Sequence, residues 1–386
     1  MFPLPLGGEG QGEGAGVSFR EQFELLPLEN LAGCADRATA ADVQAAIANG
    51  VRSLEEFSFL LSDAAGERLE DIARHAHALT LRRFGKTIQF FAPLYVSNEC
   101  ANICTYCGFS QDNKIVRKTL SVEEVVAEAG ILASQGFRHL LLVSGEHAKY
   151  VPVEYLQGVV LALKDIAPSL SIEVAPLGEE EYRRLARAGV DGLIVYQETY
   201  DRIAYAKHHP KGKKRDFDWR LETPERGARA GMRRLGIGAL IGLADWKKDA
   251  ICLVAHARYL MHHHWESILT VSVPRLRPAA GGYAPQFQMS DNHFVQLICA
   301  LRLALPDAGI VLSTREHPAL RDGLVKLGVT QMSAGSRTEP GGYSKPRQAE
   351  GQFEVEDIRS AQEIAEMVAA QGYETVWKDW EEALHG

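Results

Sequence analysis

The sequence predicts an α/β protein built on a closed (β/α)8 barrel of the TIM type. The chain has 386 residues, which suits one barrel with extensions at its ends. From about residue 90, short apolar strands alternate with longer amphipathic helices. This β-then-α unit occurs eight times, over the length that a typical barrel needs. An open, doubly wound sheet is the alternative interpretation of the same rhythm.

The chain divides into four segments. Residues 1–16 are rich in glycine and proline and should be disordered, because they offer little apolar surface to bury. Residues 17–85 carry apolar side chains at helical spacing and predict a helical extension. The barrel is predicted over 86–340, with a C-terminal extension over 341–386. The expected strands lie at 90–97, 139–145, 171–176, 192–198, 237–244, 267–276, 309–316 and 329–335.

Composition and charge exclude several classes of protein. The formal net charge is −8, so a general affinity for nucleic acid is not expected. No apolar run is long enough to span a membrane, and the N-terminus lacks the pattern of a secretory signal. We therefore expect a cytoplasmic protein.

Three of the six cysteines lie close together, in the motif C-A-N-I-C-T-Y-C. These are Cys100, Cys104 and Cys107, and in a reducing cytosol such a group indicates metal or redox chemistry. A [4Fe–4S] cluster with three thiolate ligands keeps one iron open for a ligand that is not protein. The alternative is a structural zinc site, with its fourth ligand from a distant residue. Cys252 and Cys299 lie in helical patterns and should be buried thiols.

Polar residues gather where the expected strands end. Cys100 to Cys107 follow the first strand, and Gly145–Glu146 follow the second. Because the carboxyl ends of parallel strands share one face of a barrel, we expect all of these residues at one mouth. The others are Gln197–Glu198 after the fourth strand, Arg275 and Arg277 at the sixth, Thr314–Arg315–Glu316 at the seventh and Ser333 in the eighth.

The cysteine motif resembles the signature of the radical S-adenosylmethionine (SAM) superfamily. The resemblance implies one [4Fe–4S] cluster per chain, whose open iron chelates SAM, and a SAM-derived radical that takes hydrogen from a substrate. It also implies that the ring of Tyr106 lies against adenine and that Gly145–Glu146 contact the SAM ammonium group. The alternatives are core packing for Tyr106 and a solvated acid for Glu146. Further candidates for contacts to SAM are Glu173, Gln197 and Glu198.

A closer resemblance is carried by LYVSNECANICTYCGFS, HLLLVSGEH, VYQETY, SVPRLRP, LSTRE, SAGSRTEPGGY and VWKDW, in that order. These segments resemble the tyrosine lyases of thiamine thiazole biosynthesis, the 2-iminoacetate synthase family, from about residue 20 to the C-terminus. The resemblance implies cleavage of the Cα–Cβ bond of L-tyrosine to 2-iminoacetate and p-cresol. SAM would give 5′-deoxyadenosine and methionine. Thiazole synthase is the implied protein partner, and reduced flavodoxin or ferredoxin the implied electron donor.

The same resemblance implies three residues that hold the substrate. Arg315 resembles the arginine that binds the substrate carboxylate, a task for which the planar guanidinium is well shaped. Tyr95 and Ser333 resemble polar groups near the substrate amine and carboxylate. The alternatives are an ion pair of Arg315 with Glu316 or Glu339, core packing of Tyr95, and a backbone-capping hydroxyl for Ser333.

Other functions remain as alternatives at this stage. A tyrosine lyase of [FeFe]-hydrogenase maturation would need a second cysteine cluster near the C-terminus, and no cysteine follows Cys299. A tryptophan-cleaving relative and a zinc-stapled binding module are also open. A Rossmann-type methyltransferase is disfavoured, because no glycine-rich loop precedes a suitably spaced acid. The basic run at Lys211, Lys213, Lys214 and Arg215 is expected to be a solvated loop.

Overall fold

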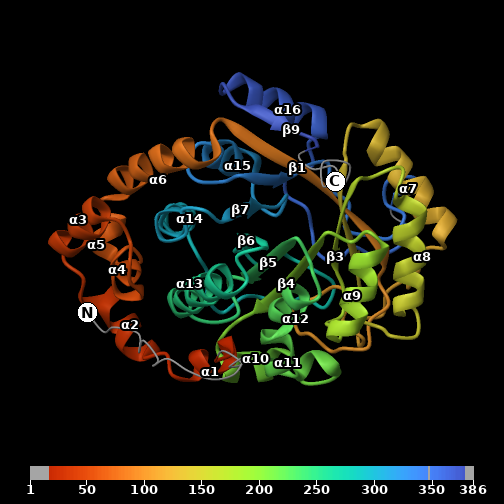
Figure 1. Ribbon diagram of the computed structural model, residues 1–386, viewed down its shortest axis with the longest axis horizontal. Coiled ribbons are helices and arrows are strands. Elements are labelled where there is room, and N and C mark those ends of the chain that lie inside the picture. The colour runs from red at the N-terminus through yellow and green to blue at the C-terminus, as the bar shows by residue number, and fades with distance from the viewer. Residues whose placement is uncertain (1–16, 347, 379–386) are drawn as a thin grey trace, which may run out of the picture.

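The computed structural model describes residues 17–346 and 348–378, and it confirms the closed barrel of eight parallel strands (Figure 1). The expected disorder of residues 1–16 lies outside the described residues. The strands are β1 (Thr87–Ser97), β2 (His139–Ser144), β3 (Ser169–Glu173), β4 (Gly192–Glu198), β5 (Arg234–Ala239), β6 (Ile268–Ser272), β7 (Gly309–Leu312), β8 (Gln331–Ser333) and β9 (Glu374–Val376).

Strand β1 closes the barrel. It pairs with β8 along its first half, at Gln89 to Phe91, and with β2 along its second half, from Ala92 onward. The remaining strands follow in chain order from β2 to β8, all parallel. The short β9 pairs with the start of β1, on the edge that β2 occupies further along.

Helices surround the barrel, and each of the eight strands is followed by at least one. After the strands come α7 (Val122–Ser134), α8 (Val153–Leu163), α9 (Glu179–Ala188), α10 (Arg202–His208), the 3-10 turn η1 (Lys213–Arg215), α11 (Phe217–Leu221), α12 (Thr223–Arg229), α13 (Trp246–His263), α14 (Asp291–Ala304), α15 (Pro318–Leu324) and α16 (Ala361–Ala370). Within the described residues, no helix is long and apolar enough to cross a membrane.

The N-terminal helices wrap around one side of the barrel (Figure 1). They are α1 (Phe19–Glu24), α2 (Leu28–Arg37), α3 (Ala40–Asn49), α4 (Leu54–Phe59), α5 (Asp63–Gly66) and α6 (Leu69–Phe84). Helices α2 and α4 pack on α13, and α6 packs on α14. Serine or threonine side chains cap the starts of α1, α3 and α4. In each case a glutamate or aspartate three residues later accepts from the backbone N–H of the cap residue, which forms a capping box.

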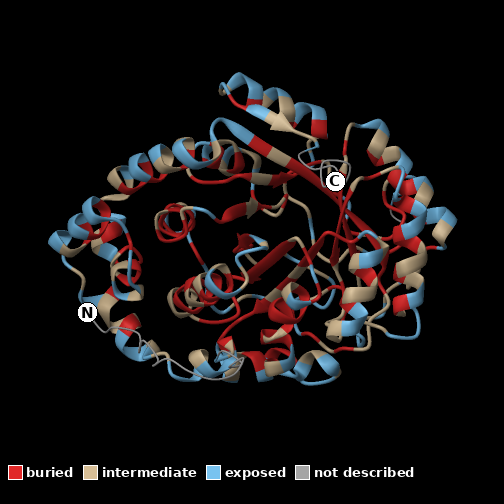
Figure 2. Cartoon of the chain, in the orientation of Figure 1, coloured by how far each residue is buried: buried red, intermediate tan, exposed pale blue. Residues whose placement is uncertain are grey.

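The core lies in the strands and on the inner faces of the helices, as Figure 2 shows by the concentration of buried residues there. Helices α13 and α14 contribute Cys252 and Cys299, both fully buried, which confirms the expected core thiols. Several strand bounds differ from expectation; β6 and β7, for example, end at Ser272 and Leu312 rather than at 276 and 316. Strand β5 begins at Arg234 rather than at 237, because a charged residue that is buried inside the barrel hides the start of the apolar run. Strand β9 was not expected, because three residues are too short for a visible alternation.

Phe19 fastens the N-terminal extension to the barrel. Its ring is 1% exposed and stacks on His256 at 4.0 Å between centroids, and its backbone N–H donates to Glu225. Removing a buried aromatic ring costs about 3–5 kcal/mol of unfolding free energy. We therefore expect Phe19→Ala to lower the urea midpoint clearly. Leu25→Ala, at a side chain that is 81% exposed in the same region, should leave it within error. An unchanged midpoint for Phe19→Ala would contradict this docking.

Candidate active site

The three clustered cysteines lie on the loop that follows β1, at the carboxyl end of the barrel. Cys104 is buried, Cys100 and Cys107 are partly buried, and all three are free thiols. Burial raises the pKa of Cys107 to about 11, and the neighbouring Cys100 thiol adds to the shift. The pKa values of Cys100 and Cys104 are raised for the same main reason. Ligation would therefore need a strongly positive centre to displace the thiol protons.

The three free thiols bear on the choice between a cluster and a single ion. Among residues 17–346 and 348–378, no three Cys, His, Asp or Glu side chains are gathered tightly enough to hold one metal ion. A structural zinc needs its ligands converging on one point, whereas a cubane binds each thiolate through a different iron. Three unpaired thiols on one loop are the ligand set that a [4Fe–4S] cluster with one open iron needs.

The end of α10 and the segment that follows it, residues 208–212, pack against the cysteine loop. Backbone N–H groups of Ile103 and Thr105 donate to the carbonyl oxygens of Lys211 and His208, at 3.1 and 3.2 Å. Gly212 has a φ of +94°, and a Cβ there would lie 2.1 Å from the side-chain oxygen of Asn102. Only glycine allows the backbone at position 212 to approach Asn102 so closely, so the cysteine loop and this segment are packed directly against each other.

Tyr106 points into the same interface. Its hydroxyl lies 2.8 Å from His209 Nε2, and His209 Nδ1 lies 2.8 Å from the carbonyl oxygen of Tyr205. The tyrosine is 8% exposed, and its ring lies 5.8 Å from the ammonium of Lys214. The packing alternative for Tyr106 is thus present in the structure, while its contact to adenine stays a prediction.

A charged network surrounds the cysteine loop. Glu146 Oε1 pairs with Arg220 at 2.9 Å, and its Oε2 accepts from Asn102 at 2.8 Å. Glu198 pairs with Lys214 at 2.7 Å and lies 3.6 Å from Arg220. Burial alone would raise the pKa of Glu198, but Lys214 and Arg220 outweigh it and hold the pKa at about 2. The network therefore joins two carboxyl side chains to two cationic side chains.

The basic run from Lys211 to Arg215 was predicted to be a solvated loop, and this prediction is wrong for Lys214. Its side chain is 11% exposed and faces the buried carboxylate of Glu198. A carboxylate inside the barrel needs a counter-charge, and one lysine of the basic run supplies it. Glu198 has a φ of 71°, the one positive value for a residue other than glycine in the described chain. Strain of this kind concentrates at functional sites.

Two other residues that were predicted to contact SAM, Gln197 and Gly145, already contact other parts of the protein. Gln197 donates its amide N–H to the carbonyl oxygen of Phe217, so that bond ties β4 to α11. Gly145 packs on the cysteine loop, because a Cβ there would lie 2.2 Å from the carbonyl oxygen of Glu99. The glycine therefore has a packing reason independent of any cofactor.

Arg315 follows β7, which is separated from β1 by β8 alone. Its guanidinium lies over the ring of Phe353 at 3.4 Å, and it makes no ion pair within the part of the chain that the structure describes. Glu316 instead binds Arg275, and Glu339 accepts from the backbone of Thr338. The expected alternative, an ion pair of Arg315 with either acid, is therefore wrong.

Tyr95, Glu173 and Ser333 lie around Arg315. The hydroxyl of Tyr95 donates to Gln352 Oε1 at 2.8 Å. Ser333 Oγ accepts from the backbone N–H of Thr314 at 3.1 Å, which is the capping contact expected as an alternative. Burial and Glu198 raise the pKa of Glu173 to about 7, and Arg315 opposes the rise. The mouth therefore offers an unpaired cation facing phenol, hydroxyl and carboxyl groups.

The structure thus brings the sequence-predicted residues to one mouth. Several residues there were not foreseen, and all of them except Asn102, which lies within the cysteine motif, reach it from distant parts of the chain. Gln352 lies 257 residues from Tyr95 in sequence, and Arg220 lies 74 residues from Glu146. The sequence held no signal for Gln352 and Phe353, because neither lies in a segment that carries the family resemblance. The unforeseen residues are Asn102, Lys214, Arg220, Gln352 and Phe353.

Comparisons with known proteins agree with this geometry. Residues 94–251 match the model of the radical SAM superfamily, and residues 272–374 match the biotin and thiamin synthesis associated domain. The chain is 45% identical to a 2-iminoacetate synthase of Escherichia coli K12, over 95% of this chain and 98% of that protein. It is 44% identical to the 2-iminoacetate synthase of Salmonella typhimurium LT2, with the same coverage.

Among solved structures, the chain is similar to the FeFe-hydrogenase maturase HydG of Carboxydothermus hydrogenoformans. The TM-score is 0.86 at 34% identity, and the match covers 94% of this chain and 86% of that one. Methylornithine synthase has a TM-score of 0.65 at 19% identity, which indicates a shared fold.

Proposed function

Because the chain belongs to the 2-iminoacetate synthase family of the radical SAM superfamily, we propose that it cleaves the Cα–Cβ bond of L-tyrosine. The products are 2-iminoacetate, which supplies the thiazole of thiamine, and p-cresol. The observation that carries the proposal is the guanidinium of Arg315, which has no ion-pair partner in the described chain and faces the mouth that holds the three thiols.

The cofactors of this family are a [4Fe–4S] cluster and SAM. We assign one cluster per chain, held by Cys100, Cys104 and Cys107. When bound, the cluster and SAM supply the reactive carbon radical that takes a hydrogen atom from the substrate. The residues around the cysteine loop carry charges opposite to those of the ammonium and carboxylate groups of SAM. Glu146 and Glu198 can accept from an ammonium group, and Arg220 can bind a carboxylate.

The substrate contacts follow from the same chemistry. Arg315 would bind the tyrosine carboxylate, which fixes Cα relative to the cysteine loop. Tyr95 and Ser333 would hydrogen-bond the amine and carboxylate, and both are less than 6% exposed. Their burial keeps water from the reacting carbon, which matters because a free radical reacts with whatever is near. Ring stacking of Tyr106 and a contact from Glu173 to SAM belong to this proposal as well.

The product suggests the partners. An imine hydrolyses quickly in water, so delivery to thiazole synthase should be direct. Reduced flavodoxin or ferredoxin would supply the electron. We place the protein in the cytoplasm. The reducing cytosol keeps thiols that have not yet bound the cluster from forming disulfides.

The activity can be tested with alternative amino acids. We expect the anaerobic, reduced protein with SAM to form p-cresol and glyoxylate, the hydrolysis product of 2-iminoacetate, from L-tyrosine. No carbon monoxide or cyanide should appear, because the chain carries three clustered cysteines and no second group. L-Tryptophan serves as the control and should be cleaved far more slowly. Faster cleavage of tryptophan, or stoichiometric cyanide, would contradict the proposal.

A further inference from the structure

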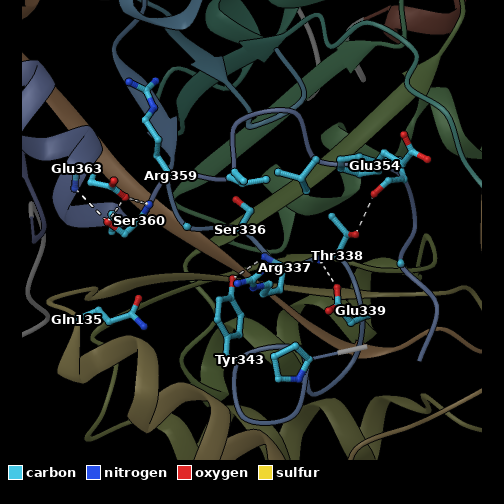
Figure 3. Close-up of a pocket in the computed structure, with 18 of the residues that line it drawn as sticks. Gln135, Ser336, Arg337, Thr338, Glu339, Tyr343, Glu354, Arg359, Ser360 and Glu363 are labelled. Carbon is cyan, nitrogen blue, oxygen red and sulfur yellow. Dashed lines mark hydrogen bonds between the residues drawn. The ribbon is translucent and has the colours of Figure 1, made fainter. Parts of the chain in front are cut away.

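The loop between β8 and α16 crosses the mouth of the barrel. We call residues 336–346 and 348–358 the strap. It also lines a cleft of about 1200 Å³ between its own residues and the ends of α7 and α16, where Thr338, Glu339 and Tyr343 are seen (Figure 3). The sequence interpretation assigned most of this segment to an extension outside the barrel. Its contacts connect it instead to the cysteine loop and to the substrate side.

Hydrogen bonds attach the strap to the barrel and to α7. The backbone N–H groups of Tyr343 and Ser344 donate to the buried carboxylate of Glu128 on α7, at 2.9 and 2.8 Å. The Tyr343 hydroxyl donates to the carbonyl oxygen of Pro93 in β1. Further along, Glu354 N–H donates to the carbonyl oxygen of Pro278, so the strap is held on both sides of the mouth.

Its central residues press against the cysteine loop. The N–H of Gly108 donates to the carbonyl oxygen of Gln352 at 3.0 Å. A Cβ at Gly108 would lie 2.6 Å from the carbonyl oxygen of Gly351 and 2.7 Å from that of Gln352. The loop that carries the thiols and the strap therefore form one packed unit.

Two strap side chains contact the residues assigned to the substrate. Phe353 presents its ring to the guanidinium of Arg315 at 3.4 Å. Gln352 accepts from the Tyr95 hydroxyl, and its own amide nitrogen lies 3.9 Å from the thiol of Cys107. A guanidinium held over the face of a ring still has N–H groups free for a carboxylate.

We propose that Phe353 and Gln352 are positioning residues of the substrate site, with Phe353 acting through Arg315 and Gln352 through Tyr95. This inference rests on the proposed function, because it assumes that Arg315 binds the tyrosine carboxylate. The stacked ring fixes the plane of the guanidinium, and the glutamine amide fixes the direction of the phenol. Neither side chain needs to touch the substrate.

The test is a double-mutant cycle on tyrosine binding without turnover. Equilibrium dialysis of labelled L-tyrosine against the cluster-loaded protein, with SAM present and reductant absent, gives the Kd. Phe353→Leu should weaken binding roughly 5- to 30-fold, the range of a partly desolvated cation–π contact. Phe353→Tyr keeps the ring and should bind as the wild type does. In an Arg315→Ala background, Phe353→Leu should change the Kd less than 2-fold, because its target is gone (about 0.4 kcal/mol at most).

A second cycle pairs Gln352→Leu with Tyr95→Phe, and the same loss of effect is expected in the double variant. Iron content and SAM affinity show that each variant is folded and loaded. Ile358→Ala, at a strap side chain that is 81% exposed, is the matched control and should bind normally.

The outcomes separate the two claims. If Phe353→Leu weakens binding by the same factor with and without Arg315, its role is structural and the inference is wrong. If Arg315→Ala itself leaves the Kd unchanged, the proposed carboxylate site fails, and the inference fails with it.

Discussion

Replacing Cys100, Cys104 or Cys107 with alanine should abolish the formation of 5′-deoxyadenosine from SAM. Each thiol is one of only three ligands that the loop offers, so the loss of any one leaves the cluster without a complete set. The barrel itself should stay folded. The loop is held by backbone hydrogen bonds from Ile103 and Gly108, which do not involve the thiols.

The measurement is iron per chain together with 5′-deoxyadenosine after anaerobic reduction. Cys34→Ala is the matched control, because Cys34 lies on α2 of the N-terminal extension. It should keep full iron content and full SAM cleavage. A Cys104→Ala variant that cleaves SAM at the wild-type rate would show that the cluster is held elsewhere.

Arg315→Ala should lower the turnover of tyrosine by roughly 30-fold or more while leaving the cluster intact. Removing one partner of a buried charge pair costs about 2–5 kcal/mol, and about 1.4 kcal/mol corresponds to a factor of ten. Desolvation lowers the pKa of the buried guanidinium, although Tyr95, Glu173 and Glu198 oppose the shift, and Arg315 makes no ion pair within the described chain. The tyrosine carboxylate would therefore lose its main counter-charge.

Lysine at this position should rescue the activity only in part, because it keeps the charge and loses the planar fork. Arg277→Ala is the control arginine at the same mouth. Arg277 already pairs with Glu356, and this partly exposed pair should matter little for turnover. The rate of p-cresol formation is measured against tyrosine concentration, alongside iron content. Near-normal kinetics with a full cluster would mean that another group holds the carboxylate.

The strand rhythm was sufficient to predict the barrel and its functional mouth, because parallel strands impose a common direction on every loop that follows them. It was not sufficient to predict which polar residues neutralise one another. Arg220 and Lys214 lie in a segment whose composition is typical of a solvated surface. Their burial follows from the need of Glu146 and Glu198 for counter-charges, which is visible only once the chain is folded.

The strap illustrates the same limit. Gln352 and Phe353 lie beyond the last strand of the barrel, in a stretch without regular periodicity. Nothing local distinguishes them from an ordinary loop. Their role arises because the strap returns across the mouth, where Gly108 and Gly351 let two backbones approach closely. Packing of this kind depends on contacts between residues more than 240 positions apart.

The central claim is that one mouth holds both the SAM-cleaving cluster and the tyrosine substrate. The most direct test is a single-turnover reaction of the anaerobic, reduced protein with SAM and L-tyrosine, in which 5′-deoxyadenosine and p-cresol are quantified in the same sample. The account predicts equimolar amounts of the two products, and neither product in the Cys104→Ala variant. Formation of 5′-deoxyadenosine without p-cresol, at a rate that tyrosine does not affect, would contradict it.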